Sequence, residues 1–496
     1  MTVRRRMAKG RHPTRSEPLA DMSFAKPILA IVIGLLWATS ALAQEDTPAP
    51  AAFLAPEASA ASAVIATGLD GVVHSAAVSY NDDGNDVVIY GACRADCAEA
   101  ASWTRVFLRV PGAIRVEIAV TPRGAPRLLI TASGADNMGG RDFLYAECGP
   151  KLGWAAEGLP EACLRPDGWS IGRVTGNRES AMGDFFELLL PVRTFALDEA
   201  GNPRFLFTDS NYFIEPDHYG LFYMSCDRAC TNAANWTETD LANHVGYQTE
   251  TFTRPVLALG PGGSAHLLAW TYAFAPDGTD LPDELYYYEC PTGCADKANW
   301  SRTALLNQGS GSYPSPTWDL AIGPDGPRAA VFLGGGAEEA DLDYTLIYFW
   351  CREACTGEES WSGSVIYRDG FGEGAAIALD AEGRPRIAFL SPDALPVLAA
   401  CDVDCEGDGA TWNGVVFEAE EDMAADRPTA IPFTCDGELW NTVSPDLALG
   451  PNGEVFVAYD VSVQARCLYR EFLEPEITYE FHEIWHGARI AEVPLP

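Results

Sequence analysis

Short apolar strands joined by glycine-bearing turns recur along the chain. A motif of apolar residue, Ala and apolar residue, followed four residues later by Gly, occurs seven times, at residues 65–71, 118–124, 195–201, 257–263, 320–326, 377–383 and 447–453. Each copy leads into a second short apolar run, so each predicts a β-hairpin. No unit shows apolar residues at helical spacing over ten or more positions, so the pattern does not predict helices.

A second motif follows each hairpin. An aromatic-rich strand ends at a Cys, a tight Cys-x3-Cys loop follows, and a Trp opens another strand, as in residues 87–108, 221–241, 285–306, 346–367 and 397–417. The repeat is about 64 residues long, since the six intervals from Gly71 to Gly453 span 382 residues. Four strands per unit are typical of β-propeller blades. We predict an all-β, seven-bladed β-propeller of four-stranded blades, from about Ser59 to Val493.

A tandem array of small separate β domains is the alternative fold. Single four-stranded sheets would leave both of their faces in need of cover, whereas closure into a ring supplies that cover. The ring is therefore the preferred interpretation.

The 14 Cys residues fit disulfide-pinned turns in an oxidising compartment. Five Cys-x3-Cys pairs occupy the turn between the predicted third and fourth strands, namely Cys93 and Cys97, Cys226 and Cys230, Cys290 and Cys294, Cys351 and Cys355, and Cys401 and Cys405. We expect Cys148 and Cys163 to form a stretched equivalent in the second unit, and Cys435 and Cys467 to form a longer link within the last blade.

The N-terminal region reads as an export signal. From Met22 to Ala43 the chain has a Lys, an apolar run and an Ala-Leu-Ala cleavage pattern. A twin-arginine signal is an alternative, because RRRMAK at 4–9 loosely matches one, although it lies far upstream of the apolar run. We expect residues 1–43 to be a signal region with the true start at Met22, 44–58 a flexible Ala/Pro-rich linker and 59–496 the propeller. The expected location is secreted or periplasmic.

The charge of the chain excludes two classes of partner. The sequence has 33 basic and 70 acidic residues, a net charge of −37. Removing residues 1–43, which hold 7 basic and 2 acidic side chains, leaves 26 basic and 68 acidic ones, a net charge of −42. Such a surface repels nucleic acid and anionic lipid. No later segment reaches 18 uninterrupted apolar residues, so we expect no membrane span after signal cleavage.

One short motif suggests a very different function. HEIWH at 482–486 matches the zinc-protease pattern, with His482 and His486 as ligands and Glu483 as general base. That chemistry needs a helix, where the two His lie about 6 Å apart on one face. The segment alternates like a strand, which separates the two His by about 13 Å. Trp485 also aligns with the Trp of the other units, so we expect the last blade's outer strand here. A metalloprotease remains a remote alternative.

The units resemble bacterial secreted β-propeller repeats of the sialidase-like, Asp-box type. The nearest copy of the Asp-box pattern is CEGDGATW at 405–412, with Gly407 where the family has Asp. The resemblance implies an arginine triad, a Tyr–Glu nucleophile pair and an Asp acid. Tyr288-Glu289 lies on a repeated strand, and one repeat position holds Arg127, Arg204, Arg328 and Arg386, which we therefore interpret as structural. No catalytic residue can be transferred from the family.

The variable connections between second and third strands are where binding is expected. Those of blades three and four are the richest in carboxylates and aromatics, with the candidate ligand-binding residues Asp209, Asn211, Tyr212, Asp217, His218, Tyr272, Asp277, Asp280, Asp283 and Glu284. Such loops suit a sugar, a peptide or calcium, and ordinary solvated acidic loops are the plain alternative. NDDGND at 81–86 lacks the spacing of an EF-hand, so no cofactor is expected beyond this possibility of calcium.

These features predict an exported, non-catalytic recognition or scaffold module for a glycan or protein ligand. The alternative is a glycan-active hydrolase or lyase with its site on the same loop-rich face. Carboxylates from blades three to five that converge on one pocket with an Arg would favour the enzyme.

Overall fold

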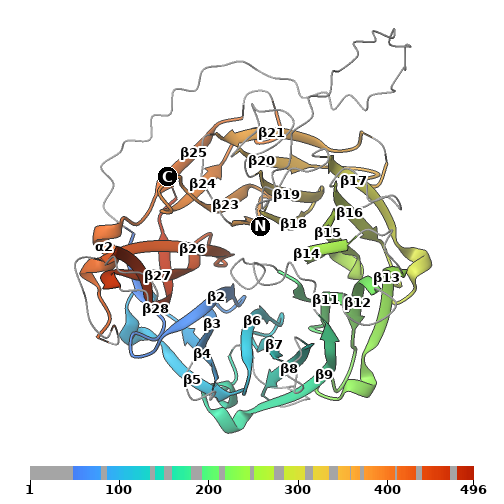
Figure 1. Ribbon diagram of the computed structural model, residues 1–496. Helices are drawn as coiled ribbons and strands as arrows, with labels where there is room; N and C mark the ends of the chain where they lie inside the picture. Colours follow the sequence, from blue (N-terminus) through green and yellow to red (C-terminus); the bar gives the residue numbers. More distant parts are fainter. Residues whose placement is uncertain are drawn as a thin grey trace, which may run out of the picture.

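A computed structural model shows seven four-stranded antiparallel sheets arranged around a central axis (Figure 1). The predicted seven-bladed β-propeller is therefore confirmed. The structure describes residues 49–79, 86–133, 140–149, 159–179, 193–211, 218–245, 251–272, 284–307, 317–333, 345–357, 359–368, 374–407, 410–429, 431, 438–469 and 478–495.

The first four blades each use four consecutive strands, ordered from the axis outwards. Blade one contains β2 (Ala60–Thr67), β3 (Val73–Ser79), β4 (Val87–Cys93) and β5 (Thr104–Arg109). Blade two contains β6 (Ala113–Val120), β7 (Pro126–Ser133), β8 (Gly140–Cys148) and β9 (Trp169–Glu179). Blade three contains β10 (Phe195–Leu197), β11 (Pro203–Asn211), β12 (His218–Ser225) and β13 (Thr237–Val245). Blade four contains β14 (Thr251–Leu259), β15 (Ala265–Tyr272), β16 (Glu284–Cys290) and β17 (Ser301–Asn307).

The last three blades complete the ring. Blade five contains β18 (Thr317–Gly323), β19 (Gly326–Leu333), β20 (Thr345–Trp350) and β21 (Ser362–Tyr367). Blade six contains β22 (Ala375–Leu379), β23 (Pro385–Leu390), β24 (Pro396–Cys401) and β25 (Trp412–Val416), and is followed by the short helix α2 (Glu420–Ala425). Blade seven contains β26 (Glu438–Leu449), β27 (Val455–Tyr469), β28 (Thr478–Val493) and, outermost, β1 (Ala51–Phe53).

The N-terminal strand β1 corrects two expectations. It pairs antiparallel with β28, with Phe53 opposite Arg489, so part of the expected linker 44–58 belongs to the propeller. HEIWH lies in a strand, as predicted, but β28 is the third strand of its blade and not the outer one. The alignment of Trp485 with the other repeat Trp residues predicts an outer strand, which is wrong. The fourth strand of this blade comes from the other end of the chain, and no repeat unit in the sequence marks it.

The hairpin motif has a direct structural reason. Its Gly has a positive φ in all seven copies, a conformation that favours glycine in a tight turn, at Gly71, Gly124, Gly201, Gly263, Gly326, Gly383 and Gly453. The central Ala of the motif lies on the innermost strand of each blade, where most copies are half-buried beside the axis. Seven small side chains leave the axis open as a channel.

The cysteine prediction is confirmed for six disulfides. The bond of the second blade joins Cys148 to Cys163, as expected for the stretched turn. The five Cys-x3-Cys turns are closed by bonds from Cys93 to Cys97, from Cys226 to Cys230, from Cys290 to Cys294, from Cys351 to Cys355 and from Cys401 to Cys405. The expected bond between Cys435 and Cys467 is not tested, because Cys435 and the Cys467 side chain lie outside the described residues.

The repeat Trp is tied to these disulfide turns. In five blades its indole N–H donates to the carbonyl of the second Cys of the turn at 2.6–3.0 Å, from Trp103, Trp169, Trp236, Trp300 and Trp361. In the first blade, for example, the acceptor is the Cys97 carbonyl. The Cys and the Trp of the motif therefore recur together because they form one hydrogen-bonded turn.

Candidate functional site

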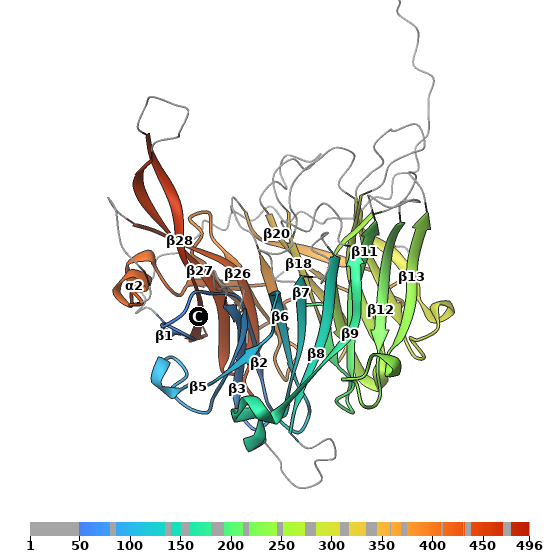
Figure 2. The same ribbon diagram turned by 60° about the horizontal axis from the view of Figure 1, so that its bottom comes forward.

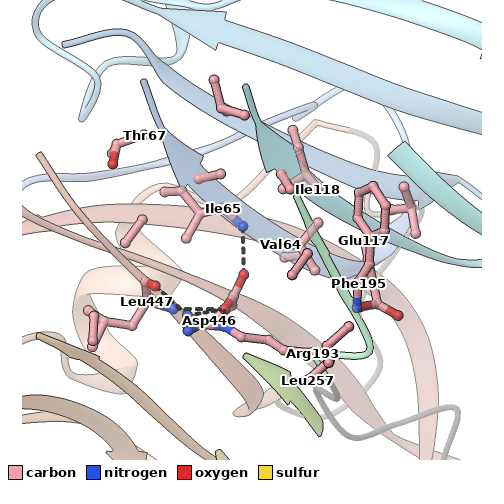
Figure 3. Close-up of a pocket in the computed structure, with 18 of the residues that line it drawn as sticks. Val64, Ile65, Thr67, Glu117, Ile118, Arg193, Phe195, Leu257, Asp446 and Leu447 are labelled. Atoms are coloured by element: carbon pink, nitrogen blue, oxygen red, sulfur yellow. Dashed lines mark hydrogen bonds and ion pairs between the residues drawn. The ribbon is translucent and has the colours of Figure 1, made fainter. Parts of the chain in front are cut away.

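The channel along the propeller axis contains a cavity of about 410 Å³ (Figure 3). The innermost strands line it with aliphatic side chains and with the Ala of the repeat motif. Its polar groups gather towards the end where second strands join third strands, which we call the loop face. The opposite end, with the glycine and disulfide turns, is the turn face.

Three carboxylates near the loop face occupy one repeat position, directly before the hairpin motif. Each accepts a backbone N–H from the innermost strand of the following blade. Glu117 accepts from Phe195 at 2.9 Å, Asp319 from Ile377 at 2.8 Å, and Asp446 from Ile65 at 2.8 Å. These bonds join blade two to three, five to six, and seven to one. The carboxylates therefore link neighbouring blades around the axis.

Arg193 reaches from the segment before blade three to Asp446 of blade seven (Figure 3). Its Nε and Nη2 donate to Asp446 at 2.8 and 2.7 Å, and its Nη1 is 3.2 Å from Asp319 Oδ2. Nη1 also donates to the Ile377 carbonyl at 3.1 Å, and Nη2 donates to the Leu447 carbonyl. The five N–H groups of a guanidinium are thus all engaged. Arg193 ties the segment before blade three to blades five, six and seven.

Burial shifts the protonation of this cluster. Desolvation raises the pKa of Glu117 and of Asp319, against the opposing attraction of Arg115 and Arg193 respectively. Asp460, on β27, accepts the N–H groups of Ser62 and Ala63 at 2.8 Å each, and burial raises its pKa to about 6. These acids hold protons more tightly than exposed carboxylates do.

The cluster does not form the pocket that would favour an enzyme. Of its acids, only Asp319 comes from blades three to five; the others belong to blades two and seven. The carboxylates already accept backbone N–H groups, and Arg193 has no donor left for a substrate carboxylate. The geometry is that of a structural hub, which we call the Arg193 hub: Arg193, Glu117, Asp319 and Asp446.

The predicted ligand residues lie at the loop face of two neighbouring blades. Asp209 and Asn211 are among the last three residues of β11, and Asn211 pairs with His218 at the start of β12. Tyr272 ends β15, and Glu284 begins β16 opposite Thr271. Of these side chains, only that of Glu284 is described. Five further candidates lie outside the described residues: Tyr212, Asp217, Asp277, Asp280 and Asp283.

Glu284 belongs to a polar and aromatic cluster on blade four. The Tyr286 hydroxyl donates to Glu284, and the guanidinium of Arg302 lies 4.4 Å from the centre of the Tyr286 ring. Arg302 also donates to the Tyr288 hydroxyl at 3.1 Å. Arg302 is exposed, while Glu284 and Tyr286 are half-buried. A planar cation on an aromatic ring beside a carboxylate offers both a stacking surface and hydrogen-bonding groups.

The repeated arginines are structural, as predicted. Each donates Nη1 to the carbonyl of the preceding Pro and of the third-strand Cys at 2.7–3.2 Å, from Arg127, Arg204, Arg328 and Arg386. Glu289 lies on β16, and burial raises its pKa. The hydroxyl of its neighbour Tyr288 accepts a hydrogen bond from Arg302. The sialidase-type arginine triad is not reproduced by these residues.

A Ser–His pair on blade four has nucleophile-like spacing. Ser264 Oγ is 3.0 Å from His266 Nε2, and His266 Nδ1 is 2.6 Å from the Tyr287 hydroxyl. Burial lowers the pKa of His266 to about 4 and raises the pKa of Tyr287. The phenol therefore stays protonated and donates a hydrogen bond to Nδ1. The proton of the neutral imidazole is then on Nε2, facing Ser264. In this arrangement the imidazole does not activate the hydroxyl.

The described residues give no support to a metal site. Within them, no three His, Cys, Asp or Glu side chains are grouped to hold a metal ion. HEIWH is extended, so His482 and His486 lack the helical spacing of a zinc protease. Asp86, the last residue of the acidic segment NDDGND, accepts the N–H of Gly112 at 2.9 Å, and the rest of that segment lies outside the described residues.

Sequence reasoning missed the Arg193 hub. Glu117, Asp319 and Asp446 share the position before the hairpin motif, so their alignment alone could have marked them. Arg193 lies outside every repeated position, and no sequence signal connects it to residues more than 120 positions away. No helix in the described parts of the chain is long and apolar enough to cross a membrane.

Comparison with known proteins finds similarity only among solved structures. No family model and no curated protein matches the sequence. A protein of unknown function from Dyadobacter fermentans is 9% identical with a TM-score of 0.40, over 90% of this chain and 99% of that one. An ulvan lyase, a polysaccharide lyase, is 9% identical with a TM-score of 0.44, over 82% and 94%.

A third similar structure is the NanB sialidase of Streptococcus pneumoniae. It is 10% identical with a TM-score of 0.39, over 88% of this chain and 69% of that one. At such identities and TM-scores the similarity carries no inference about activity, which must be argued from this chain's own residues.

Proposed function

We propose that this protein is an exported propeller that binds a glycan on the loop face of blades three and four. The observation that carries the proposal is the cluster of Glu284, Tyr286 and Arg302, in which Glu284 lies beside the strand ends that hold the other candidates and Arg302 lies further along the blade. Sugars present apolar ring faces and many hydroxyl groups. An aromatic surface flanked by a carboxylate and a guanidinium matches both features.

Two further observations support an exported glycan-binding protein. The six disulfides of the described residues suit an oxidising compartment outside the cytosol. The net charge of −37 disfavours nucleic acid and anionic lipid as partners but does not oppose a neutral carbohydrate. In the channel, Arg193 and the described carboxylates already make hydrogen bonds within the protein, which favours the loop face as the binding site.

A glycan array probed with the mature protein tests this proposal. We expect binding to a defined set of oligosaccharides, and we expect Glu284→Gln to weaken it about tenfold, the effect of losing one charged hydrogen bond of about 1.4 kcal/mol. Glu289→Gln is the matched control, because Glu289 is on the same strand towards the turn face. Absence of binding to any glycan, or equal loss in both variants, would refute the proposal.

A glycan-active hydrolase or lyase, with its acid in the axial channel where the channel opens towards the loop face, is the second candidate function. The observation in its favour is that burial raises the pKa of Glu117, of Asp319 and of Asp460, the last to about 6. A general acid for glycoside cleavage needs such a shift. Against it, Asp460 accepts two backbone N–H groups in the folded protein. Incubating each glycan that binds with the protein and analysing products by mass spectrometry separates binding from cleavage.

A further inference from the structure

Blade seven has an incomplete outer strand. In the other six blades the fourth strand pairs with five to eight residues of the third. In blade seven, β1 pairs with only three residues of the 16-residue strand β28, from Arg489 to Ala491. Among the described residues, no strand pairs with the outer edge of β28 between Thr478 and Trp485. Figure 2 shows β27 and β28 rising above the neighbouring blades on the loop face.

The register identifies the backbone groups on this edge. Near β1, the edge-facing groups belong to even positions, because Ala488 accepts from Leu54 and Glu492 donates to Pro50. The register against β27 shifts by one residue between Glu483 and Trp485. Alternation along a strand then places the N–H and C=O groups of residues 479, 481 and 483 on the open edge.

The part of this edge that β1 covers shows how β28 binds an additional strand. Phe53 of β1 lies 5.3 Å from the Trp485 ring, and the Arg489 guanidinium lies 4.6 Å from the Phe53 ring. A Cβ at Gly487 would come within 2.1 Å of the Trp485 ring and 2.8 Å of the Phe53 ring, so glycine makes room for both rings. The edge of β28 therefore already binds one extended segment through backbone bonds and an aromatic anchor.

We propose that the open edge of β28 binds an extended, basic segment of a partner protein as an added β-strand. Residues 478–485 contain Glu480 and Glu483 but no Lys or Arg, on a chain of net charge −37, so a basic strand is the complementary partner. An uncovered strand edge recognises a peptide backbone whatever its sequence, and charge then selects among peptides. The added strand would continue the one that β1 begins.

Hydrogen exchange on the whole mature protein tests this proposal. The probe is an acetylated ten-residue peptide of alternating Lys and Thr, and its Glu-for-Lys counterpart is the control peptide. We expect the basic peptide to slow amide exchange in residues 478–485 about tenfold, as for hydrogen bonds that must open before exchange. We expect no slowing with the acidic peptide. Phe481→Pro, which removes one edge-facing N–H without touching the ladder to β27, should abolish the effect.

A second variant covers the case in which Phe481→Pro disturbs the hairpin. The double variant Glu480→Lys, Glu483→Lys keeps the backbone and should weaken peptide binding, whereas Glu382→Lys, Glu454→Lys on the turn face should not. Protection outside 478–485, or protection unchanged in a folded Phe481→Pro protein, contradicts the proposal. Concentration-dependent protection without any peptide also overturns it, because a second copy would then cover the edge. Glycan binding is independent of every outcome.

Discussion

One repeated side-chain position near the axis links a blade to the next where it holds a carboxylate. The position directly before the hairpin motif is occupied, in chain order, by Val64, Glu117, Thr194, Val256, Asp319, Ala376 and Asp446. Where it is a carboxylate, the side chain accepts an N–H from the next innermost strand. Buried carboxylates are costly unless such bonds and a cation compensate them. Arg193 and Arg115 provide that compensation.

Asp460 has no arginine partner among the described contacts, and this gives it a measurable pH signature. Its pKa in the folded protein is about 6, above the ordinary value of 3.8, because it is buried. Between these two pH values the folded state binds a proton that the unfolded state does not bind. The contribution of Asp460 to the free energy of unfolding is therefore fully present below pH 4 and is lost as pH rises through 6. The difference amounts to at most about 3 kcal/mol.

Asp460→Asn should remove this pH dependence. Urea unfolding at pH 4 and pH 7 is expected to show the variant gaining up to about 3 kcal/mol relative to the wild type at the higher pH. The loss of one backbone hydrogen bond in the variant lowers the free energy of unfolding equally at both pH values, so it cancels when the two are compared. Asp325→Asn, at an exposed turn position, controls for general charge effects. A wild-type-to-variant difference that is the same at both pH values would contradict the assignment.

At the scale of elements, the sequence predicts repeats well and exceptions poorly. Glycine with positive φ, the channel Ala and the Cys-x3-Cys turn each produce a signal in every blade or nearly so. The short strand β1 produces none, because three residues of Ala and Phe have no period of their own. The alternation of HEIWH predicts a strand, but the order of that strand in the blade depends on the pairing of β28 with residues more than 400 positions away.

The ring closure by β1 depends on Phe53. Phe53→Ala removes a ring that is 3% exposed and packed against Trp485 and Arg489. We expect a loss of about 3–5 kcal/mol in the free energy of unfolding, as for buried Phe elsewhere. Phe107→Ala on β5, where the side chain is 45% exposed, should change it by less than about 0.5 kcal/mol. Denaturant unfolding measures both, and equal effects would show that β1 does not close the ring.

For the whole molecule, the Arg193 hub explains how a ring of separate sheets behaves as one body. Each blade packs on its neighbours through apolar clusters, but Arg193 also bonds across the axis to Asp319, Asp446 and the Ile377 carbonyl. Contacts of this kind connect non-adjacent blades. Local opening of one blade boundary must then also break bonds at others, so the hub should raise the cooperativity of unfolding.

Arg193→Ala tests both the hub and the location of the binding site. It leaves Asp319 and Asp446 buried without their cation, which should cost about 3–5 kcal/mol in the free energy of unfolding. Arg193→Lys keeps the charge but not the five-donor fork, so a smaller loss is expected. The double variant Arg193→Ala, Asp446→Asn should lose less free energy of unfolding than the two single variants lose together, because the two residues share the same bonds. Denaturant unfolding of these three variants, of Asp446→Asn and of the wild type provides these values. If the hub is structural and the loop face binds the glycan, Arg193→Lys keeps the wild-type glycan affinity; a large loss of affinity in this folded variant would instead place the ligand in the channel.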